Sequence, residues 1–277
     1  MTNSDYAELT SRNTGLVSAS VQQRLRRTTV LVAGVGSTGG AVIEPLARIG
    51  VGALILAEPG DYELSNLNRQ QAYRADIGAN KAATAARRVA GINPDCALSV
   101  HTDGVTPDNV GSLLDRATIV VDGVDVTTRA GWAAKLAVHR GAAQRALTVI
   151  SGWDLACSQY VRLYRYGSGQ PVLDGITADL VETLPVWSLI KRVLPSRVFP
   201  DALADDIAVR GGREPEYHVP QLIQTAMLFG AIATQIVVDH AGQVPGPDEI
   251  LVDLQHLTTG VPSVRDGRAG DWYRSLP

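Results

Sequence analysis

The 277-residue chain contains only two cysteines, Cys96 and Cys157. Two thiols cannot build a disulfide framework or supply the four sulfur ligands of a structural zinc site. No apolar run reaches the ~18 residues that a membrane-spanning helix needs. The first residues are polar and include Asp5 and Glu8, which is unlike a signal peptide. We therefore expect no zinc, no membrane association and a cytoplasmic location.

The chain also lacks an excess of charge of either sign, because its net charge is −3 and its pI is about 5.9. This balance gives no general attraction to nucleic acid, so we expect no nucleic-acid partner. Neither a repeat nor a linker interrupts the sequence, and 277 residues can bury the core of one large α/β domain. We divide that domain into an N-terminal arm and helix (1–27), a nucleotide-binding part (28–158) and an antiparallel extension (159–277).

Apolar runs typical of buried strands alternate with helical patterns in the first half of the chain. The predicted strands are Thr29–Ala33, Ala53–Ala57, Ala97–His101, Thr118–Val121 and Thr148–Ser151. The predicted helices between them are Thr38–Ile49, Asn80–Ile92, Asn109–Arg116 and Thr127–Gly141. Pro45 predicts a kink or a late start in the first of these helices. The fold class is α/β, a Rossmann-like, mostly parallel sheet with helices on both faces.

The pattern changes in the C-terminal half, where Gln159–Tyr166 and Glu249–Leu254 predict antiparallel strands that extend the sheet. Gln221–His240 predicts a long buried helix. Repeated prolines predict an irregular segment over 171–220, with a short helix between Pro185 and Pro195. At the other end, residues 1–15 are expected to form a mobile arm, followed by a short helix over Val17–Arg27.

Gly34, Gly36 and Gly39 lie in the sequence GVGSTGG, between a predicted strand and a predicted helix. Glycines in this position let a nucleotide phosphate approach the amides at a helix N-terminus. The pattern alone is weak, because a glycine-rich turn can be only a turn. Glu58 ends the second strand 24 residues after Gly34, where an acid usually binds ribose hydroxyls; its alternative is a solvated loop acid.

Two cations follow this loop. Arg69 lies after Asn66 in the sequence SNLNRQ, and Lys81 opens the next predicted helix. A lysine at a helix N-terminus makes an anion site. The alternatives are that Asn66 caps a turn and that both cations are ordinary surface charges. Because they accompany the glycine loop, we assign all three residues, together with Gln70, to nucleotide binding.

Asp122 and Asp125 follow the fourth strand in the sequence VVDGVD. An acid at the carboxyl edge of the sheet and beside phosphates is placed to hold Mg²⁺. We choose Asp125 as the metal ligand and Asp122 as support. The alternative is that Asp125 or Thr127 caps the helix that begins near Thr128. A nicotinamide enzyme with the same glycine loop would leave Arg69, Lys81 and Asp125 without a role.

Taken together, GVGSTGG, SNLNRQ, the GANK sequence at 78–81 and VVDGVD resemble the ThiF/MoeB/HesA family, which has the fold of ubiquitin-activating enzymes. The resemblance runs from about Arg12 to Gln159. It implies ATP and Mg²⁺ binding and adenylation of a carboxylate, usually the C-terminal glycine of a ubiquitin-like or sulfur-carrier protein. It also implies a homodimer in which Arg12 reaches the ATP of the partner. The site residues it implies are Glu58 on the ribose, Asn66, Arg69 and Lys81 on the phosphates, and Asp125 on Mg²⁺.

The chain departs from this family at several points. It lacks the two CxxC pairs that often hold zinc and the cysteine of the crossover loop, so we expect neither zinc nor a thioester step. Gly60 stands where a second acid is usual. We expect segment 171–220 to select the substrate through apolar residues and cations. The apolar residues are Leu184, Trp187, Ile190, Val193, Leu194 and Phe199, and the cations are Lys191, Arg192, Arg197, Arg210 and Arg213.

The sequence thus predicts an ATP-dependent adenylyltransferase that acts on a peptide, a carrier-protein C-terminus or a small acid. Catalysis would consist of positioning and charge neutralisation by Arg12, Arg69, Lys81 and Asp125. One alternative is a non-catalytic member of the family that binds a partner. The other, less favoured, is an NAD-dependent oxidoreductase.

Overall fold

The computed structural model describes residues 3–211 and 217–264. It contains one seven-stranded sheet with the order β3-β2-β1-β4-β5-β6-β7. The first five strands along this order are parallel, and β6 and β7 are antiparallel to their neighbours. The strands are β1 Thr29–Ala33, β2 Ala53–Ala57, β3 Ala97–His101, β4 Ile119–Asp122, β5 Thr148–Leu155, β6 Ser158–Arg165 and β7 Glu249–Asp253. The predicted fold class is confirmed.

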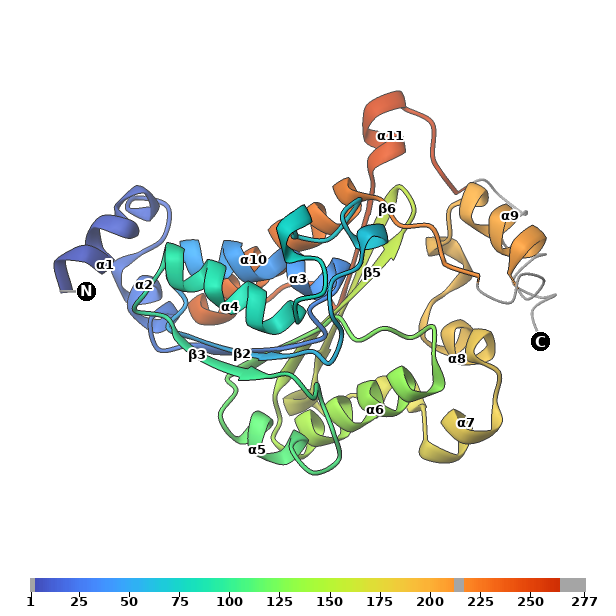
Figure 1. The fold of residues 1–277 in the computed structure, drawn as a ribbon, viewed down its shortest axis with the longest axis horizontal. Coiled ribbons are helices and arrows are strands. Elements are labelled where there is room, and N and C mark those ends of the chain that lie inside the picture. The colour runs from blue at the N-terminus through green and yellow to red at the C-terminus, as the bar shows by residue number, and fades with distance from the viewer. Residues whose placement is uncertain (1–2, 212–216, 265–277) are drawn as a thin grey trace.

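Helices cover both faces of the sheet (Figure 1). Helices α3 (Ser37–Ile49), α4 (Lys81–Ile92) and α10 (Ile223–Gly242) cover one face, and α5 (Val110–Asp115) and α6 (Arg129–Gln144) cover the other. Alternate residues of the strands enter separate apolar clusters, so that Val30 packs toward the first face and Leu31 toward the second. This is why the parallel strands are continuously apolar in sequence.

Strand β5 is four residues longer than predicted. Its parallel pairing with β4 ends at Ser151, but its antiparallel pairing with β6 continues as far as Leu155 opposite Ser158. The hairpin of β5 and β6 therefore projects beyond the carboxyl end of β4. This projection carries Trp153 and Asp154 into the region where open α/β sheets bind ligands.

Helix α3 begins at Ser37 and continues through Pro45 to Ile49, so it has no late start, and the kink that we gave as the other possibility stays a prediction. Pro45 has no N–H to donate to the carbonyl of Ala41, four residues earlier. A Cβ added to Gly230 of α10 would lie only 2.5 Å from this carbonyl oxygen. The absence of a side chain at Gly230 thus lets α10 approach α3 closely at this turn.

The N-terminal region is docked on the domain from residue 3 onward, which corrects the prediction of a mobile arm for residues 3–15; residues 1 and 2 lie outside the described residues. Helix α1 (Asn3–Leu9) is followed by a 3₁₀ turn at Ser11–Asn13 and by α2 (Ala19–Leu25). The side chain of Tyr6 is buried, and its hydroxyl donates a 2.7 Å hydrogen bond to the carbonyl of Gly50. This contact fixes α1 at the C-terminal end of α3.

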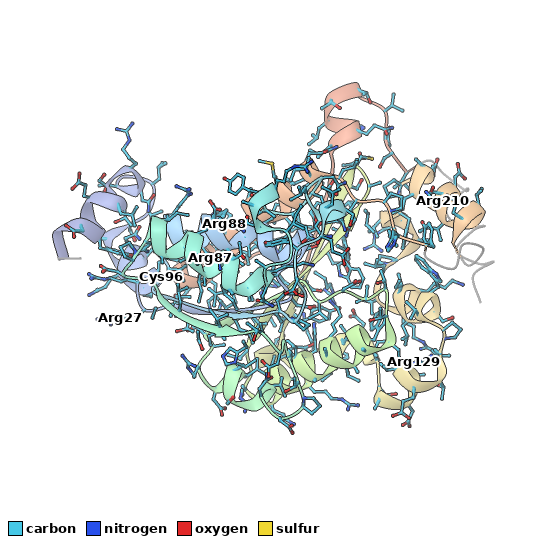
Figure 2. All side chains as sticks on the ribbon, in the orientation of Figure 1. Arg27, Arg87, Arg88, Cys96, Arg129 and Arg210 are labelled. Atoms are coloured by element: carbon cyan, nitrogen blue, oxygen red, sulfur yellow. The ribbon has the colours of Figure 1, made fainter. Side chains whose placement is uncertain are left out.

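Segment 171–220 is more regular than its prolines suggested. It forms α7 (Ala178–Thr183), α8 (Val186–Val193) and α9 (Asp201–Arg210), and α8 is the helix predicted between Pro185 and Pro195. Figure 2 shows Arg129 at the start of α6, and its guanidinium donates to the carbonyls of Val181 and Leu184 and so ties α7 to α6.

The last described helix, α11 (Leu254–Thr259), follows β7 directly. Within residues 3–211 and 217–264, no helix has both the length and the apolar character of a membrane span, and this includes α10.

Candidate active site

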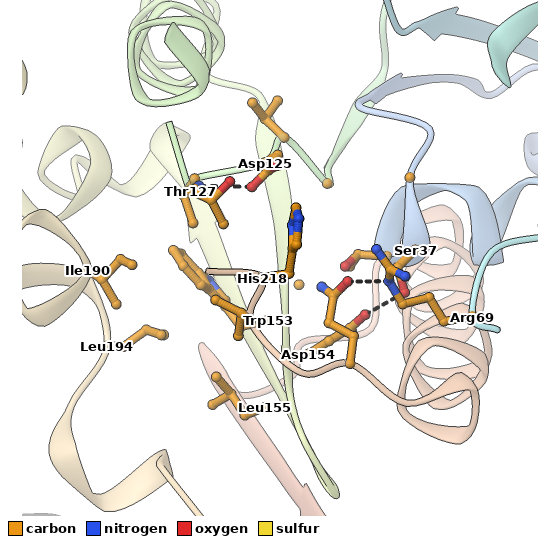
Figure 3. Close-up of a pocket in the computed structure, with 18 of the residues that line it drawn as sticks. Ser37, Arg69, Asp125, Thr127, Trp153, Asp154, Leu155, Ile190, Leu194 and His218 are labelled. Atoms are coloured by element: carbon orange, nitrogen blue, oxygen red, sulfur yellow. Dashed lines mark hydrogen bonds between the residues drawn. The ribbon is translucent and has the colours of Figure 1, made fainter. Parts of the chain in front are cut away.

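A cavity of about 310 Å³ lies at the carboxyl edge of the sheet, between the glycine loop and helices α8 and α9 (Figure 3). Its wall is formed by the start of α3, the loops after β2 and β4, Lys135 of α6, the projecting end of β5, helices α8 and α9 with the residues between them, and residues 217–221. Of the predicted site residues, those that line it are Gly36, Glu58, Arg69, Gln70, Lys81 and Asp125. Those that do not line it are Arg12, Gly34, Gly39, Asn66 and Asp122.

Gly34 and Gly39 do not line the cavity, but they allow the tight backbone path of the glycine loop. Gly34 has a φ of +82°, and a Cβ there would lie 2.4 Å from the carbonyl oxygen of Gly123. A Cβ on Gly39 would lie 2.0 Å from the carbonyl oxygen of Gly34. These two glycines are therefore required for the tight turn between β1 and α3.

Gly36 is the N-cap of α3, and no side chain in the described part of the chain caps the helix. The N–H groups in the first turn of a helix have no partner within the helix, and Gly36 and Ser37 line the cavity. The exposed amides and the helix dipole make this turn suitable for a phosphate. It is the part of the site that best fits a nucleotide.

Glu58 holds the glycine loop in place. Its carboxylate accepts hydrogen bonds from the amides of Val35 at 2.7 Å and of Gly60 at 2.8 Å. A Cβ on Gly60 would lie 2.8 Å from Oε1 of Glu58, so the glycine that departs from the family pattern makes room for this bond. Glu58 borders the cavity, and its proposed contact with the ribose remains a prediction.

The structure brings Arg69, Gln70 and Lys81 together on the cavity wall. Nε of Arg69 donates a 2.6 Å hydrogen bond to Oε1 of Gln221, which lies just before α10. Lys81 follows Asn80, which caps α4. Asn66, by contrast, is buried, and its side chain accepts a hydrogen bond from the amide of Glu63 at 3.1 Å, as in the turn-capping alternative.

Asp125 borders the cavity, and its Oδ1 accepts a 2.8 Å hydrogen bond from the amide of Thr127. It does not cap α6, because the N-cap is Thr128, whose hydroxyl accepts a hydrogen bond from the amide of Gly131 at 3.1 Å. The capping alternative is therefore wrong for both Asp125 and Thr127. One carboxylate is a sufficient protein ligand for Mg²⁺ that is also bound to phosphates.

Asp122 does not reach the cavity, which corrects our placement of this residue beside the nucleotide. It is fully buried, and its Oδ2 accepts hydrogen bonds from Lys135, from Ser151 at 2.8 Å and from His139 at 3.0 Å. Burial opposes ionisation of Asp122, but Lys135 and His139 outweigh it and hold its pKa well below the usual range. Burial lowers the pKa of His139, so a neutral imidazole donates to a charged carboxylate.

Lys135 connects this buried network to the site, because it lines the cavity and its Nζ lies 4.7 Å from the ring centroid of Trp153. The sequence contains a signal for this network that we did not use in our predictions. Lys135 and His139 are four residues apart on one helix and therefore share one face, and that face packs on the strand that carries Asp122.

Asp154 is the most informative residue that was not among the predicted ones. Only 7% of its surface is exposed, and its Oδ2 accepts a 2.9 Å hydrogen bond from the hydroxyl of Ser37. Burial raises its pKa to about 6, against the opposing effects of Ser37, Thr38 and Arg69. No sequence signal marked this residue, because the strand was predicted to end at Ser151.

The wall opposite the glycine loop is mostly apolar, and His218 is its polar member. It is formed by Trp153 and Leu155 of β5, by helices α8 and α9, and by residues 217–219. The apolar residues of these last segments that line it are Trp187, Ile190, Leu194, Phe199, Leu203, Ile207, Tyr217 and Val219. In Figure 3, Ile190 and Leu194 lie on one side of Trp153, while Ser37 and Arg69 lie on the other.

The cations of segment 171–220 have a different position from the one we expected. Lys191, Arg192, Arg197 and Arg210, the four that the structure describes, are not part of the cavity wall. Arg197 pairs with Glu249, and Arg210 pairs with Asp206. Arg213 lies outside the described residues. Inside the cavity this segment contributes apolar residues and the imidazole of His218.

Neither cysteine lines the cavity. Cys96 is buried, and burial raises the pKa of its thiol to about 11. Sγ of Cys157 lies 3.9 Å from Oε1 of Gln255, outside the site. Within the described ranges, no three side chains of His, Cys, Asp or Glu form a group that could hold a metal ion.

Arg12 lies in the 3₁₀ turn beside the C-terminal end of α3, where the neighbouring Asn13 donates a 3.3 Å hydrogen bond to the carbonyl of Ile49. The glycine loop is at the other end of the same helix. Thirteen helical residues separate these ends by about 18 Å at 1.5 Å per residue. Arg12 is therefore far from the cavity of its own chain.

Comparison with known proteins agrees with this geometry. Residues 10–178 match the ThiF family. "Protein HesA, vegetative" from Trichormus variabilis is 44% identical over 102 residues, which are 36% of this chain and 38% of that protein. The tRNA threonylcarbamoyladenosine dehydratase of Escherichia coli is 40% identical over 98 residues, 35% of this chain and 37% of that protein.

A third relative is the sulfur carrier protein ThiS adenylyltransferase of Bacillus subtilis, 37% identical over 112 residues, 39% of this chain and 33% of that protein. The matched region thus spans well under half of each of these relatives.

Solved structures share the fold over most of the chain. PaaA superposes with a TM-score of 0.67 at 20% identity and covers 92% of this chain and 81% of its own. The dehydratase TcdA of Escherichia coli, solved in complex with ATP, superposes with a TM-score of 0.63 at 21% identity and covers 88% of this chain and 97% of its own. The sheet order, the glycine loop and the match over residues 10–178 lead to one conclusion: the chain belongs to the ThiF family.

Proposed function

We propose that the protein is an ATP-dependent adenylyltransferase that activates a carboxylate as an acyl-adenylate. The observation that carries this proposal is the composition of one cavity. An uncapped helix N-terminus, Arg69, Lys81 and Asp125 line it on one side, and an apolar wall lines the other. The first group suits a triphosphate, and the apolar wall leaves room for a second substrate that is not a nucleotide.

The proposed reaction is an in-line displacement. A carboxylate oxygen of the acyl substrate forms a bond to the α-phosphorus of ATP, and the bond from that phosphorus to the bridging oxygen breaks, which releases pyrophosphate. The first-turn amides of α3, Arg69 and Lys81 would hold the phosphates and neutralise charge as it develops. Asp125 would hold Mg²⁺, which supplies further positive charge to the phosphates.

The names of the relatives support an adenylating activity. One is an adenylyltransferase for the sulfur carrier ThiS, and TcdA was solved with ATP. In this chain the acyl substrate would be a small acid, a peptide or a carrier-protein C-terminus. Neither free cysteine lines the cavity, so the proposed reaction includes no thioester step.

We also propose that the active form is a homodimer in which Arg12 acts on the partner's ATP. The distance between Arg12 and the cavity of its own chain supports this arrangement, since one helix length separates them. The docked α1 helix, held by Tyr6, would present the 3₁₀ turn in a fixed position.

The test is exchange of labelled pyrophosphate into ATP in the presence of candidate carboxylic acids, combined with calorimetry of ATP·Mg²⁺ and NAD⁺. We expect ATP·Mg²⁺ to bind far more tightly than NAD⁺ and exchange to depend on an added acid. Tighter binding of NAD⁺ would favour the oxidoreductase alternative. Tight ATP binding without exchange for any acid would favour a non-catalytic, partner-binding role.

A further inference from the structure

Asp154 lines the cavity and has one carboxylate oxygen without a hydrogen-bond partner among the described residues. Its Oδ2 is engaged by Ser37, but its Oδ1 is buried and has no hydrogen-bond partner among the described residues. Thr38 also favours the charged form of the carboxyl, without a hydrogen bond to Oδ1. In Figure 3, Asp154 lies beside Ser37 and Arg69 at the edge of the open space.

A buried acceptor without a donor is costly, because the group has lost its water and gained nothing in return. Such groups are rare in folded proteins, and those that persist call for an explanation. Asp154 lies in the part of β5 that pairs with β6, and this pairing continues to Leu155. Its position is therefore set by the sheet and not by a flexible loop. A donor supplied by a bound ligand would satisfy Oδ1.

The position of Asp154 restricts which part of a ligand can supply this donor. Ser37, which donates to Asp154, is the first residue of α3 and lies in the turn suited to a phosphate. An acyl substrate must bring its carboxylate to the α-phosphorus at that turn. The group that meets Asp154 is therefore close to the reacting carboxylate, within a few bonds of it.

The residues on both sides of Asp154 define the rest of the ligand. Trp153 and Leu155 also line the cavity, and the wall continues into α8 through Ile190 and Leu194. A substrate that ends in glycine would leave this wall without a contact. A branched or aromatic side chain attached near the carboxylate would bury apolar surface against it.

We infer that the acyl substrate is an α-amino acid, free or at the C-terminus of a peptide, with a bulky apolar side chain and an α-nitrogen that donates to Asp154. This inference rests on the proposed function and specifies its substrate. The α-nitrogen is attached to the carbon next to the carboxyl, which satisfies the distance restriction. The ammonium of a free amino acid and the amide N–H of a peptide C-terminus can both donate this hydrogen bond, and the test below distinguishes the two.

The test compares three acids of one carbon skeleton: leucine with an ammonium, N-acetyl-leucine with an amide N–H, and 4-methylpentanoic acid with no nitrogen. Calorimetry in the presence of a non-hydrolysable ATP analogue and Mg²⁺ gives their affinities. We expect leucine or N-acetyl-leucine to bind about ten- to a hundredfold more tightly than 4-methylpentanoic acid, as for a hydrogen bond to a charged group. The better of the two identifies a free amino acid or a peptide. N-acetylglycine, which lacks the side chain, should bind at least tenfold more weakly than N-acetyl-leucine.

The Asp154→Asn variant should lose this preference for nitrogen, with little change in its affinity for 4-methylpentanoic acid. Asp108→Asn, at an exposed aspartate outside the cavity wall, is the matched control and should keep the preference. Equal binding of all three acids, or binding of none, would overturn the inference. A weaker affinity for ATP·Mg²⁺ in Asp154→Asn, with the nitrogen preference intact, would overturn it too and make Asp154 a metal ligand.

Pyrophosphate exchange with the same acids separates this inference from the proposed function. If 4-methylpentanoic acid supports as much exchange as the better of leucine and N-acetyl-leucine, adenylation still stands but the proposed role of Asp154 is wrong. The opposite outcome is a binding preference for the acids with nitrogen that is lost in Asp154→Asn and is followed by no exchange with any acid. In that case Asp154 keeps its proposed role and the adenylation proposal is wrong.

Discussion

The hydroxyl of Ser37 donates a 2.9 Å hydrogen bond to the carboxylate of Asp154, across 117 residues of sequence. This bond joins the first turn of α3 to the projecting end of β5. It therefore connects the part of the cavity that suits phosphate with the part that suits an acyl group. Several measurements can test what the bond and its neighbours do.

The first prediction concerns the stability of the free protein as a function of pH. Burial raises the pKa of Asp154 to about 6, above its value of about 3.9 in an unfolded chain. The folded state therefore binds the proton of Asp154 more tightly than the unfolded state does. The stabilisation that results is complete below about pH 3.9 and is lost as the pH rises through 6. Asp154→Asn has no such titration, so its stability relative to the wild type should improve by on the order of 2 to 3 kcal/mol between pH 4 and pH 7.5.

Urea unfolding of both proteins at several pH values measures this difference. Groups other than Asp154 titrate alike in the two proteins and cancel in the comparison. A difference in stability that does not change between pH 4 and pH 7.5 would show that the carboxyl is not perturbed.

The second prediction concerns Lys81 and Asp125, which border the cavity without belonging to the core. Lys81→Ala and Asp125→Ala should each reduce pyrophosphate exchange by roughly 10²- to 10³-fold, as for the loss of one group from a pre-organised anion site. Melting temperatures should stay within a few degrees of the wild type. If pyrophosphate exchange is undiminished in either variant, the substituted residue is only a surface charge.

The third prediction concerns catalysis across the dimer. Arg12→Ala and Lys81→Ala should each be inactive as pure proteins, but mixed dimers should recover part of the activity. Each mixed dimer retains one complete site if Arg12 acts on the partner. The measurement is exchange activity after mixing under conditions that let subunits exchange, with the mixed dimer verified by differential tagging. Inactive mixed dimers would place Arg12 and Lys81 of one chain in the same site, and undiminished exchange by pure Arg12→Ala would remove Arg12 from the site.

The fourth prediction concerns the buried network around Asp122. Asp122→Asn leaves Lys135 without a counter-charge in a fully buried position, which should destabilise the protein by about 3 to 5 kcal/mol. The Asp108→Asn change, at an exposed position outside the cavity wall, should have a much smaller effect. Urea unfolding of both variants checks this, and equal stability would contradict a structural role for the network.

The same network predicts loss of stability in acid. The folded-state pKa values of Asp122 and His139 are both lowered. Their contributions are therefore complete above the unfolded values of about 3.9 and 6.5, and are lost as the pH falls below these values. The contribution of this network should fall below about pH 6.5, while that of Asp154 rises as the pH falls through 6. Below about pH 4 the loss from Asp122 remains, so Asp122→Asn should lose less stability than the wild type between pH 4 and pH 3, measured by urea unfolding.

The fifth prediction concerns segment 171–220, of which helices α8 and α9 form the apolar wall. The acid that best supports exchange should slow hydrogen exchange in α8 and α9 beyond the effect of ATP alone, because it buries their cavity-facing side chains. Mass spectrometry of peptides from these helices, with and without each ligand, makes the comparison. Full protection by ATP alone would make the segment a nucleotide lid.

Most of the sheet and the phosphate-binding turn could be predicted because their signals are local. Strands such as Ala53–Ala57 are uninterrupted apolar runs, and the glycines between β1 and α3 are required by contacts within a few residues of the turn and with one neighbouring loop. Arg69 and Lys81 come after β2, and Asp125 comes after β4. Because the loops after parallel strands lie at the carboxyl edge of the sheet, the position of these residues could be predicted.

The parts that could not be predicted depend on contacts between distant segments. Asp154 reaches the cavity because β6 pairs with β5 beyond the end of β4, and no local pattern sets the length of that pairing. The N-terminal arm looked mobile because the contacts that dock it on α3 are distant in sequence: the one from Tyr6 to Gly50 spans 44 residues and the one from Asn13 to Ile49 spans 36. Asp122 resembled a ligand because its partners Lys135 and His139 lie one helix further along the chain.

The close contact of Gly230 with the carbonyl of Ala41 has a consequence for how ligands enter and leave. It locks α3 and α10 into one rigid block, and that block carries Ser37 at the start of one helix and Gln221, the partner of Arg69, just before the other. The phosphate-binding wall cannot retreat without unpacking the two helices. Helices α8 and α9 form the opposite wall, and Arg129 joins α7, the helix before them, to α6 through the carbonyls of Val181 and Leu184. Under the proposed function, we therefore expect the acyl substrate and its product to pass on the apolar side of the cavity, opposite this block.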